Sequence, residues 1–206
     1  MPALRITRIE DVGERTVAIE VQTPTEFEAY PGQFVLVRAT IDGEEETGYY
    51  TISSPDVEEF FEMTVAVDPD GTLGTWLVER TIDEEITVEG PFGDIRYTGE
   101  DDALVFARGP GIGPAVGIAE LARESGHDAT IVHGGKQPPH QKRLTHLEER
   151  GVTVILTNDL SGTVESLTAD EMYVFGFQGF IEETKDALTA ADVDLAEVEM
   201  ESFGPA

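Results

Sequence analysis

The stretch that decides the fold is Ala103-Leu104-Val105-Phe106-Ala107-Arg108-Gly109-Pro110-Gly111-Ile112-Gly113-Pro114-Ala115. Its first five residues form an unbroken apolar run, which is typical of a strand buried on both faces of a parallel sheet. A glycine-rich turn follows, and the alanine-rich segment 115–124 predicts a helix. Glycines let the backbone approach a pyrophosphate, and the unpaired N–H groups at a helix start attract its charge. The stretch fits a dinucleotide-binding loop, although a tight strand-to-helix turn without a ligand has the same pattern.

The rest of the C-terminal half continues this alternation. Apolar runs predict strands over residues 129–133, 152–156, 172–175 and 198–203, and helices over 141–150 and 178–188. Strands separated by helices at this spacing indicate a doubly wound parallel sheet. We therefore expect an α/β domain that binds NAD(P) over residues 99–206, with its boundary in the acidic, glycine-containing stretch 98–102.

The N-terminal half has a different period. Short stretches in which every second residue is apolar recur between turn signals such as Pro31-Gly32 and Asp42-Gly43. This pattern predicts an antiparallel, six-stranded type of β-barrel over residues 1–98, with one short helix near 73–80. The clearest alternating sets are Val17, Ile19 and Val21, and Phe61, Met63, Val65 and Val67. The fold class expected for the chain is thus β followed by α/β.

Charge and composition exclude several classes of function. The 206 residues include 42 acidic and 13 basic ones, for a formal net charge of −29, which argues against binding to nucleic acid or to anionic membranes. There is no cysteine for a disulfide, a thiol nucleophile or a cysteine-ligated iron–sulfur cluster on this chain. Acidic residues spread over both halves, with only three lysines, favour a halophilic protein. The first residues do not resemble a signal peptide, so we expect a cytoplasmic location.

Three clusters in the N-terminal half combine aromatic, hydroxyl and glycine residues. They can stack on a flat ring, hydrogen-bond its edge or offer backbone donors to an anion, and each one alone also fits barrel packing and turn chemistry. The clusters are Gly48-Tyr49-Tyr50-Thr51-Ile52-Ser53-Ser54, Gly71-Thr72-Leu73-Gly74-Thr75-Trp76-Leu77 and Val88-Glu89-Gly90-Pro91-Phe92-Gly93.

The order of these motifs resembles the ferredoxin–NADP reductase family over essentially the whole chain. The family's P-G-Q-[FY] strand is similar to residues 31–34, its R-x-Y-[ST] signature to 48–51, and its flavin-phosphate turn to 74–77. Its G-P-x-G element is similar to residues 90–93, and its G-x-G-x-x-P loop to Gly109, Gly111 and Pro114. Its C-G-P and E-x-[FY] elements are similar to residues 175–177 and 201–203.

The resemblance implies a flavin in the barrel, FAD or FMN, with NADPH or NADH as co-substrate. Tyr50 would flank the isoalloxazine ring, Thr51 would hydrogen-bond near its reactive nitrogen, and Glu201 and Phe203 would lie beside it. We group these four residues as catalytic. The residues expected to bind a cofactor are Tyr50, Thr51, Ile52, Ser53, Gly74, Thr75, Trp76, Arg108, Gly109, Gly111, Ile112, Gly113, Pro114, Lys136 and Gly176.

Two positions depart from the family pattern. Gly48 stands where the family has an arginine for the flavin phosphate, a loss of roughly 1.5–3 kcal/mol if no other group replaces it. Arg108 and Arg38 are the hypothetical substitutes. Phe175 stands where the family has a cysteine near the nicotinamide, and its bulk is expected to obstruct stacking of the nucleotide.

The remaining polar residues carry weaker signals. Lys136 and Arg143 follow the second strand of the predicted sheet and are hypothetical contacts for a ribose 2′-phosphate, or simply solvated residues. The four histidines match no metal-ligand spacing, so we predict no metal site and expect solvated or strand-end histidines.

The function that these features favour is a flavin-dependent oxidoreductase between NAD(P)H and an unidentified acceptor, either ferredoxin or a small molecule. The alternative is a degenerate, non-catalytic relative that acts as a ligand-binding or interaction protein, which Gly48 and Phe175 favour. The electron-transfer subunits of dihydroorotate dehydrogenases carry a cysteine-ligated [2Fe–2S] segment, so we expect no close match to them.

Overall fold

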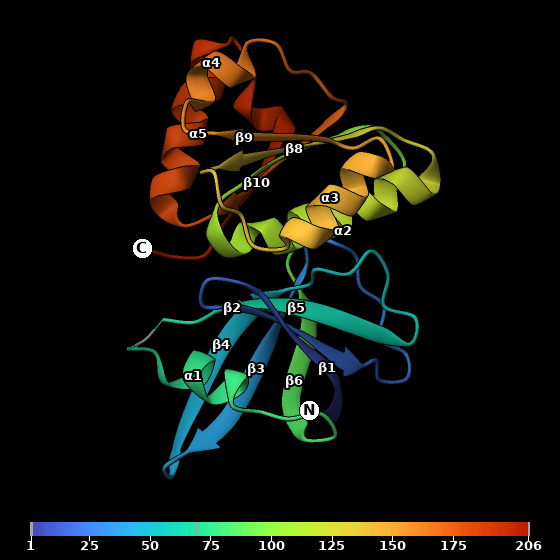
Figure 1. The fold of residues 1–206 in the computed structure, drawn as a ribbon, viewed down its shortest axis with the longest axis vertical. Coiled ribbons are helices and arrows are strands. Elements are labelled where there is room, and N and C mark those ends of the chain that lie inside the picture. Colours follow the sequence, from blue (N-terminus) through green and yellow to red (C-terminus); the bar gives the residue numbers. More distant parts are fainter. Residues whose placement is uncertain (1, 69, 206) are drawn as a thin grey trace.

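The computed structural model describes residues 2–68 and 70–205 and contains two sheets that follow one another along the chain (Figure 1). The first sheet is antiparallel, with the strand order β4-β3-β6-β1-β2-β5. Its elements are β1 (Ala3–Gly13), β2 (Thr16–Gln22), β3 (Phe34–Ile41), β4 (Glu44–Thr51), β5 (Phe60–Ala66), α1 (Thr72–Val78) and β6 (Glu85–Phe92). A bridge between Ile52 and Met63 joins the two outer strands, which closes the predicted barrel.

The barrel core follows the alternation in the sequence. In β5, Phe61, Met63 and Val65 are fully buried, and in β2 Ile19 and Val21 are. These side chains share one hydrophobic cluster with the buried face of α1. The predicted helix therefore exists, two residues shorter at its C-terminal end than expected, and it packs against β3 and β4.

The second sheet is parallel, with the order β11-β10-β7-β8-β9. The run 103–107 is its central strand and all five residues are buried. The elements are β7 (Ala103–Ala107), a 3₁₀ turn (Gly109–Gly111), α2 (Ile112–Ser125), β8 (Ala129–Gly134), α3 (Gln141–Glu149), β9 (Thr153–Thr157), α4 (Leu160–Val164), β10 (Glu171–Gly176), α5 (Gln178–Ala190), a second 3₁₀ turn (Leu195–Glu197) and β11 (Val198–Ser202). The predicted β plus α/β fold class is confirmed, and among the elements of residues 99–205 the sequence patterns missed the short α4 and the second 3₁₀ turn.

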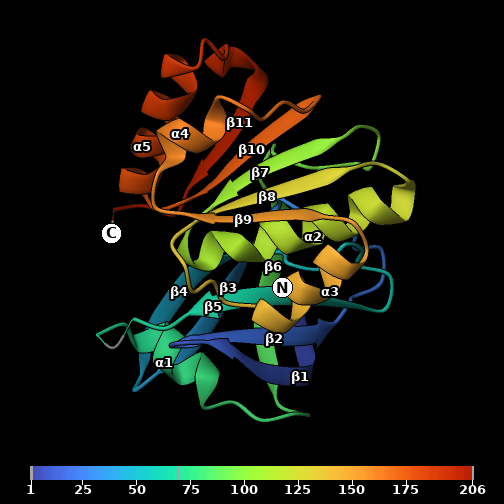
Figure 2. The same ribbon diagram turned by 45° about the horizontal axis from the view of Figure 1, so that its top comes forward.

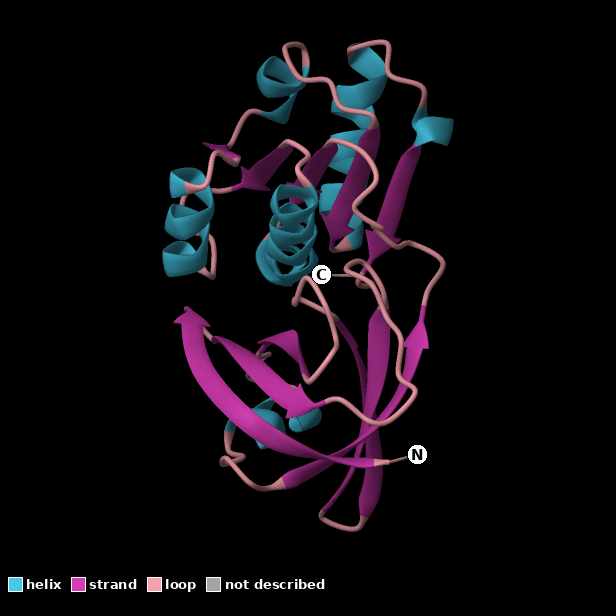
Figure 3. Cartoon of the chain, turned by 90° about the vertical axis from the view of Figure 1, so that its right-hand side faces the viewer, coloured by secondary structure: helices cyan, strands magenta, loops and turns pink. Residues whose placement is uncertain are grey.

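Helices cover both faces of the parallel sheet. One hydrophobic cluster joins α2 and α3 to the face that carries Val105, Ile131 and Phe175, and another joins α4 and α5 to the face that carries Phe106 and Val174. Figures 2 and 3 show that α2 lies between the sheet and the barrel. The barrel therefore meets the helix that begins at the glycine-rich loop.

The segment between the sheets is anchored to both. Tyr97 is fully buried, its N–H donates to the carbonyl of Pro31, and its ring meets Tyr173 edge-on at 6.2 Å. The predicted domain boundary between residues 98 and 99 falls in this segment and stays a prediction. In the described part of the chain, no helix combines the length and apolar character needed to cross a membrane.

Candidate active site

An aromatic cavity of about 570 Å³ lies where the barrel meets the last strand of the parallel sheet. The ring of Phe34 packs edge-on against Tyr49, with 5.4 Å between ring centres, and lies 6.0 Å from the ring of Phe92. Thr51 and residues from the end of the chain complete the wall. The lining residues are Phe34, Tyr49, Thr51, Phe92, Glu201, Ser202, Phe203 and Gly204.

Three of the four residues predicted as catalytic meet in this cavity, namely Thr51, Glu201 and Phe203. The register of β10 and β11 explains the position of the last two. Glu201 pairs with Phe175, and the N–H of Phe203 donates to the carbonyl of Gly176 at 2.9 Å. Burial raises the pKa of the Glu201 carboxyl above its usual range. The C-terminal strand thus brings a carboxyl and an aromatic ring to the mouth of the barrel.

The fourth residue, Tyr50, does not line the cavity. Successive strand residues point to opposite faces, so Tyr49 and Thr51 share the cavity side and Tyr50 faces the barrel-core cluster. Burial raises the pKa of the Tyr50 hydroxyl to about 12. Tyr49 is 68% exposed and is the aromatic residue of this strand that sequence reasoning missed. Because alternate residues of a strand lie on the same face, the position two residues before Thr51 would have identified Tyr49.

Ile52 and Ser53, both predicted to bind a cofactor, are fully buried. Ile52 belongs to the barrel core, and the Ser53 hydroxyl donates to Glu62 at 2.8 Å.

The predicted flavin-phosphate turn lies in α1. The Thr75 hydroxyl donates to the carbonyl of Gly71 at 2.8 Å, and the Trp76 ring lies under the Arg80 guanidinium at 4.3 Å. A Cβ at Gly74 would make only ordinary contacts of 3.7 Å, so packing does not require glycine there.

Gly48, across from this turn, is crowded. A Cβ there would lie 2.9 Å from Cδ2 of Leu73 and 3.1 Å from the Tyr50 ring. Arg38, a hypothetical substitute, pairs with Glu45 at 2.5 Å. Tyr50 and Leu73 therefore occupy the space beside the missing arginine.

The glycine-rich loop after β7 combines an open backbone with close packing. Gly109 has φ +60° and no atom near its Cβ position, so it faces open space. A Cβ at Gly111 would lie 2.7 Å from the carbonyl carbon of Phe175, and one at Gly113 would lie 2.6 Å from the Thr64 hydroxyl of the barrel. Ile112 and Pro114 are buried in the first turn of α2. Glycine is thus required at 111 and 113 because other backbone and side chains approach them.

The predicted cations around the loop have different surroundings. Arg108 pairs with Glu183 at 2.7 Å, donates to the carbonyl of Gly134 and lies over the Phe180 ring at 4.6 Å. Lys136 is exposed after the end of β8. The space at Gly176 is filled by the Phe180 ring, 2.7 Å from where a Cβ would lie.

Three expectations about single residues are wrong. The Phe175 side chain is fully buried in the α2-side cluster, parallel to Tyr173, so it cannot obstruct a nucleotide at the loop. His140 is buried, and its Nε2 lies 2.8 Å from the Thr64 hydroxyl. Arg143 is not a solvated loop residue, because Glu62, Glu120 and Ser53 hold it between the barrel and the parallel-sheet half, and these bonds already occupy its donors. In each case contacts with residues distant in the sequence determine where the side chain lies.

Among the described residues, no group of three or more His, Asp or Glu side chains is arranged to hold a metal ion.

Comparison with known proteins supports a fold in which an FAD-binding type of barrel precedes a parallel-sheet half. Residues 3–97 match the family model of the oxidoreductase FAD-binding domain. The FAD/NAD-binding domain of nitric oxide dioxygenase from Vibrio cholerae O1 biovar El Tor superposes with a TM-score of 0.80 at 17% identity and covers 98% of both chains. Residues 3–97 therefore belong to the oxidoreductase FAD-binding domain family, and the chain is similar to reductase subunits that are ferredoxin reductase-like flavoproteins.

Two curated relatives show where the similarity lies. The glycine betaine monooxygenase reductase subunit of Chromohalobacter salexigens is 32% identical over 145 residues, which is 66% of this chain and 39% of that protein. The probable dihydroorotate dehydrogenase B (NAD(+)), electron transfer subunit, of Archaeoglobus fulgidus is 28% identical over 97% of this chain and 84% of its own length. The chain therefore spans about two fifths of the first relative and most of the second.

Proposed function

We propose that this chain is a flavin-dependent oxidoreductase that passes electrons between NAD(P)H and an acceptor through FAD held in the barrel. The observation that carries the proposal is the aromatic cavity, which combines Thr51 of the FAD-binding-type barrel with Glu201 and Phe203 of the C-terminal strand. Family membership of the barrel and the glycine-rich loop of the parallel sheet support it.

The cavity walls suit a flat, largely apolar ring. Phe34, Tyr49 and Phe203 offer aromatic surface on several sides, and the Thr51 hydroxyl is available to hydrogen-bond a ring nitrogen at the edge. A flavin held there would supply the hydride and electron chemistry that links the nicotinamide to the acceptor. The residues that line the cavity would orient the ring.

Glu201 brings an ionisable group to the same cavity. Because burial raises its pKa, the carboxyl is easier to protonate than an exposed glutamate. A protonated Glu201 can donate a hydrogen bond to a ligand in the cavity, and an ionised one can only accept.

The nucleotide is expected to lie at the carboxyl end of β7. The loop over residues 109–114 leads into α2, whose first N–H groups attract phosphate, and Gly109 leaves the approach open. Because Arg108 is already paired with Glu183, backbone donors are expected to carry most of the phosphate contact. Lys136 is the exposed cation that we propose for the ribose end.

The acceptor is proposed from the relatives. Reductase subunits of oxygenases and an electron transfer subunit are among them, so a redox protein such as ferredoxin is the expected partner, with a small molecule as the alternative. The −29 charge supports a halophilic, cytoplasmic setting for this reaction.

One observation favours the non-catalytic alternative. Leu73 and Tyr50 crowd the Gly48 position, where the family pattern has an arginine for the flavin phosphate. A barrel that has lost that contact would hold the cofactor weakly or not at all.

Absorbance spectroscopy separates the two functions. The protein is reconstituted with FAD and with FMN in molar KCl, and then titrated anaerobically with NADH and NADPH. Bound flavin that bleaches on addition of either nucleotide supports the oxidoreductase, and the absence of flavin bands after reconstitution would overturn it. Tyr49→Ala should weaken flavin binding, and Tyr50→Phe is its control, because only Tyr49 of these two residues lines the cavity.

A further inference from the structure

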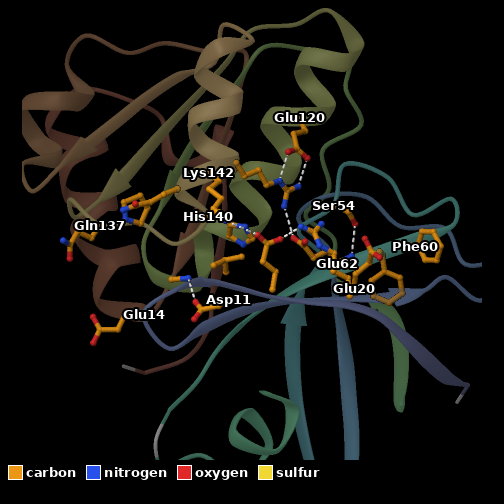
Figure 4. Close-up of a pocket in the computed structure, with 18 residues that line it drawn as sticks. Asp11, Glu14, Glu20, Ser54, Phe60, Glu62, Glu120, Gln137, His140 and Lys142 are labelled. Atoms are coloured by element: carbon orange, nitrogen blue, oxygen red, sulfur yellow. Dashed lines mark hydrogen bonds and ion pairs between the residues drawn. The ribbon is translucent and has the colours of Figure 1, made fainter. Parts of the chain in front are cut away.

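A second cavity, of about 830 Å³, lies between the barrel and helix α3 and shares no lining residue with the aromatic cavity. Figure 4 shows Glu120 of α2 and Glu62 of β5 approaching its wall from the two domains. Between these carboxylates lies the guanidinium of Arg143, from α3. The cluster is well shielded, with the Arg143 side chain 20% exposed and the Glu62 and Glu120 side chains each 15% exposed.

Arg143 uses three nitrogens for four hydrogen bonds. Towards its own domain, Nε and Nη2 donate to the two carboxylate oxygens of Glu120, at 2.6 and 2.5 Å. Towards the barrel, Nη1 donates to Glu62 at 2.9 Å and Nη2 to the carbonyl of Ser53 at 2.6 Å. A planar fork with donors on several edges can hold all three partners together, whereas a lysine ammonium cannot reproduce this geometry.

On the barrel side, the cluster holds the end of the strand that carries Thr51. Ser53 lies two residues after Thr51, and its N–H and hydroxyl donate to the backbone and side chain of Glu62, each at 2.8 Å. The same Ser53 carbonyl that accepts from Arg143 lies 3.0 Å from where a Cβ at Gly117 of α2 would be. Arg143 is thus bonded to the segment that leaves the aromatic cavity.

On the sheet side, the cluster holds the helix that begins at the glycine-rich loop. Glu120 lies in α2, and the first turn of α2 follows directly from Gly111. Gly113 and Gly117 let this helix approach the barrel closely, so its position depends on contacts across the domain interface. One side chain therefore connects the strand end beside the proposed flavin ring to the helix behind the proposed nucleotide loop.

We infer that Arg143 is a positioning residue that sets the distance between the flavin ring and the nicotinamide by fixing Ser53 of the barrel against α2. The inference rests on the proposed function of the aromatic cavity and the loop. Hydride transfer requires the reacting atoms to be held about 3–3.5 Å apart, and a misplacement of about 1 Å can cost about 100-fold in rate. Arg143 touches neither ligand site directly.

The main test compares the wild type with Arg143→Gln and Arg143→Lys by stopped-flow reduction of the FAD-loaded protein in molar KCl. We expect the limiting rate of flavin reduction to fall about 10- to 100-fold in Arg143→Gln. The dissociation constants of FAD and of the nucleotide should change less than about 3-fold, because Arg143 lines neither the aromatic cavity nor the glycine-rich loop. Arg143→Lys keeps the charge but loses the fork, so its rate should fall as well.

Arg150→Gln is the matched control. It removes the same charge from the residue that follows α3, and its ion pair with Glu124 lies within the C-terminal half, so the rate should match that of the wild type. If Arg143→Gln does not fold, Glu62→Gln and Glu120→Gln weaken the cluster from either side and should each lower the rate. An unchanged limiting rate in the folded Arg143 variants would overturn the inference, and so would an unchanged rate in both Glu62→Gln and Glu120→Gln.

A second readout does not depend on activity. Because the chain has no cysteine, Glu44→Cys in the barrel and Glu182→Cys in α5, both exposed, provide unique sites for a spin-label pair. We expect the distance distribution between the labels to broaden or shift on Arg143→Gln and to stay unchanged on Arg150→Gln. An unchanged distribution with Arg143→Gln contradicts the inference. A wild type that binds no flavin refutes the proposed function, yet this measurement still decides whether Arg143 sets the domain spacing.

Discussion

Cδ2 of Leu73 lies 2.9 Å from the position that a Cβ on Gly48 would occupy, so helix α1 fills the space beside the missing arginine of the flavin signature. The sequence alone suggests that restoring the arginine tightens flavin binding. The structure adds a steric condition, since the side chain at 48 must share this space with Leu73 and Tyr50.

We therefore expect Gly48→Arg alone to change FAD affinity little, and Gly48→Arg combined with Leu73→Ala to raise it. A restored charge-assisted contact is worth about 1.5–3 kcal/mol, or roughly 10- to 150-fold in the dissociation constant. Fluorescence titration of the apoprotein measures both values, with Leu73→Ala as the control for loss of packing. Equal affinities for the double variant and Leu73→Ala would indicate that no phosphate lies near this position.

Salt should strengthen flavin binding. The chain carries a net charge of −29 and no arginine at position 48, so its field repels the pyrophosphate of FAD. Raising the ionic strength from 0.1 M to 1 M shortens the Debye length from about 10 Å to about 3 Å and screens this repulsion. We expect the dissociation constant of FAD to fall with KCl and that of uncharged riboflavin to change less. A dissociation constant that rises for FAD alone would point to a cationic phosphate site.

Gly111→Ala should destabilise the protein strongly. The added methyl group would lie 2.7 Å from the carbonyl carbon of Phe175, on the backbone of β10, which cannot move away as a side chain can. Overpacking of this kind costs about 1–3 kcal/mol or more. Denaturant unfolding measures the loss. Gly179→Ala is the control, because its Cβ position in α5 is open, and a stability equal to or above that of the wild type is expected there. Equal effects of the two variants would contradict the packing observed at Gly111.

Acid should weaken the domain interface through His140. Burial, and then the charge of Arg143, lower its pKa from 6.5 to about 3. In the unfolded chain His140 takes up a proton near pH 6.5, while in the folded chain it stays neutral, so its contribution lowers stability as the pH falls from about 6.5 to about 3. The slope approaches about 1.4 kcal/mol per pH unit in the middle of this window.

The measurement compares the free energy of unfolding of the wild type and His140→Asn between pH 7 and pH 4. Asparagine tolerates the positive φ of 60° at this position and carries no titratable group. We expect the difference between the two proteins to change in favour of the variant as the pH falls. Parallel curves would mean that His140 is accessible to protons in the folded state.

The fold was predictable because its signals are local. The run 103–107 is long and apolar enough to be a central parallel strand, and the alternation around Ile19 and Met63 suits an antiparallel barrel. The residues of the aromatic cavity were partly predictable. Thr51, Glu201 and Phe203 belong to ordered motifs, whereas Tyr49 stands at an unspecified position of its motif and depends on which face of β4 meets the cavity.

The amino-acid sequence alone determines the two sheets, the glycine-rich loop between β7 and α2, and a strongly acidic chain with few cations. These features follow from periodicity, composition and backbone freedom, which act over a few residues at a time. Only the tertiary structure decides that Phe175 is buried, that Leu73 crowds Gly48, and that Arg143 joins the domains. Those facts depend on which distant segments pack together. Arg143 lies in a charged stretch that sequence patterns place at the surface, and only its bonds to Glu62, Glu120 and Ser53 show that it links the barrel to the parallel-sheet half.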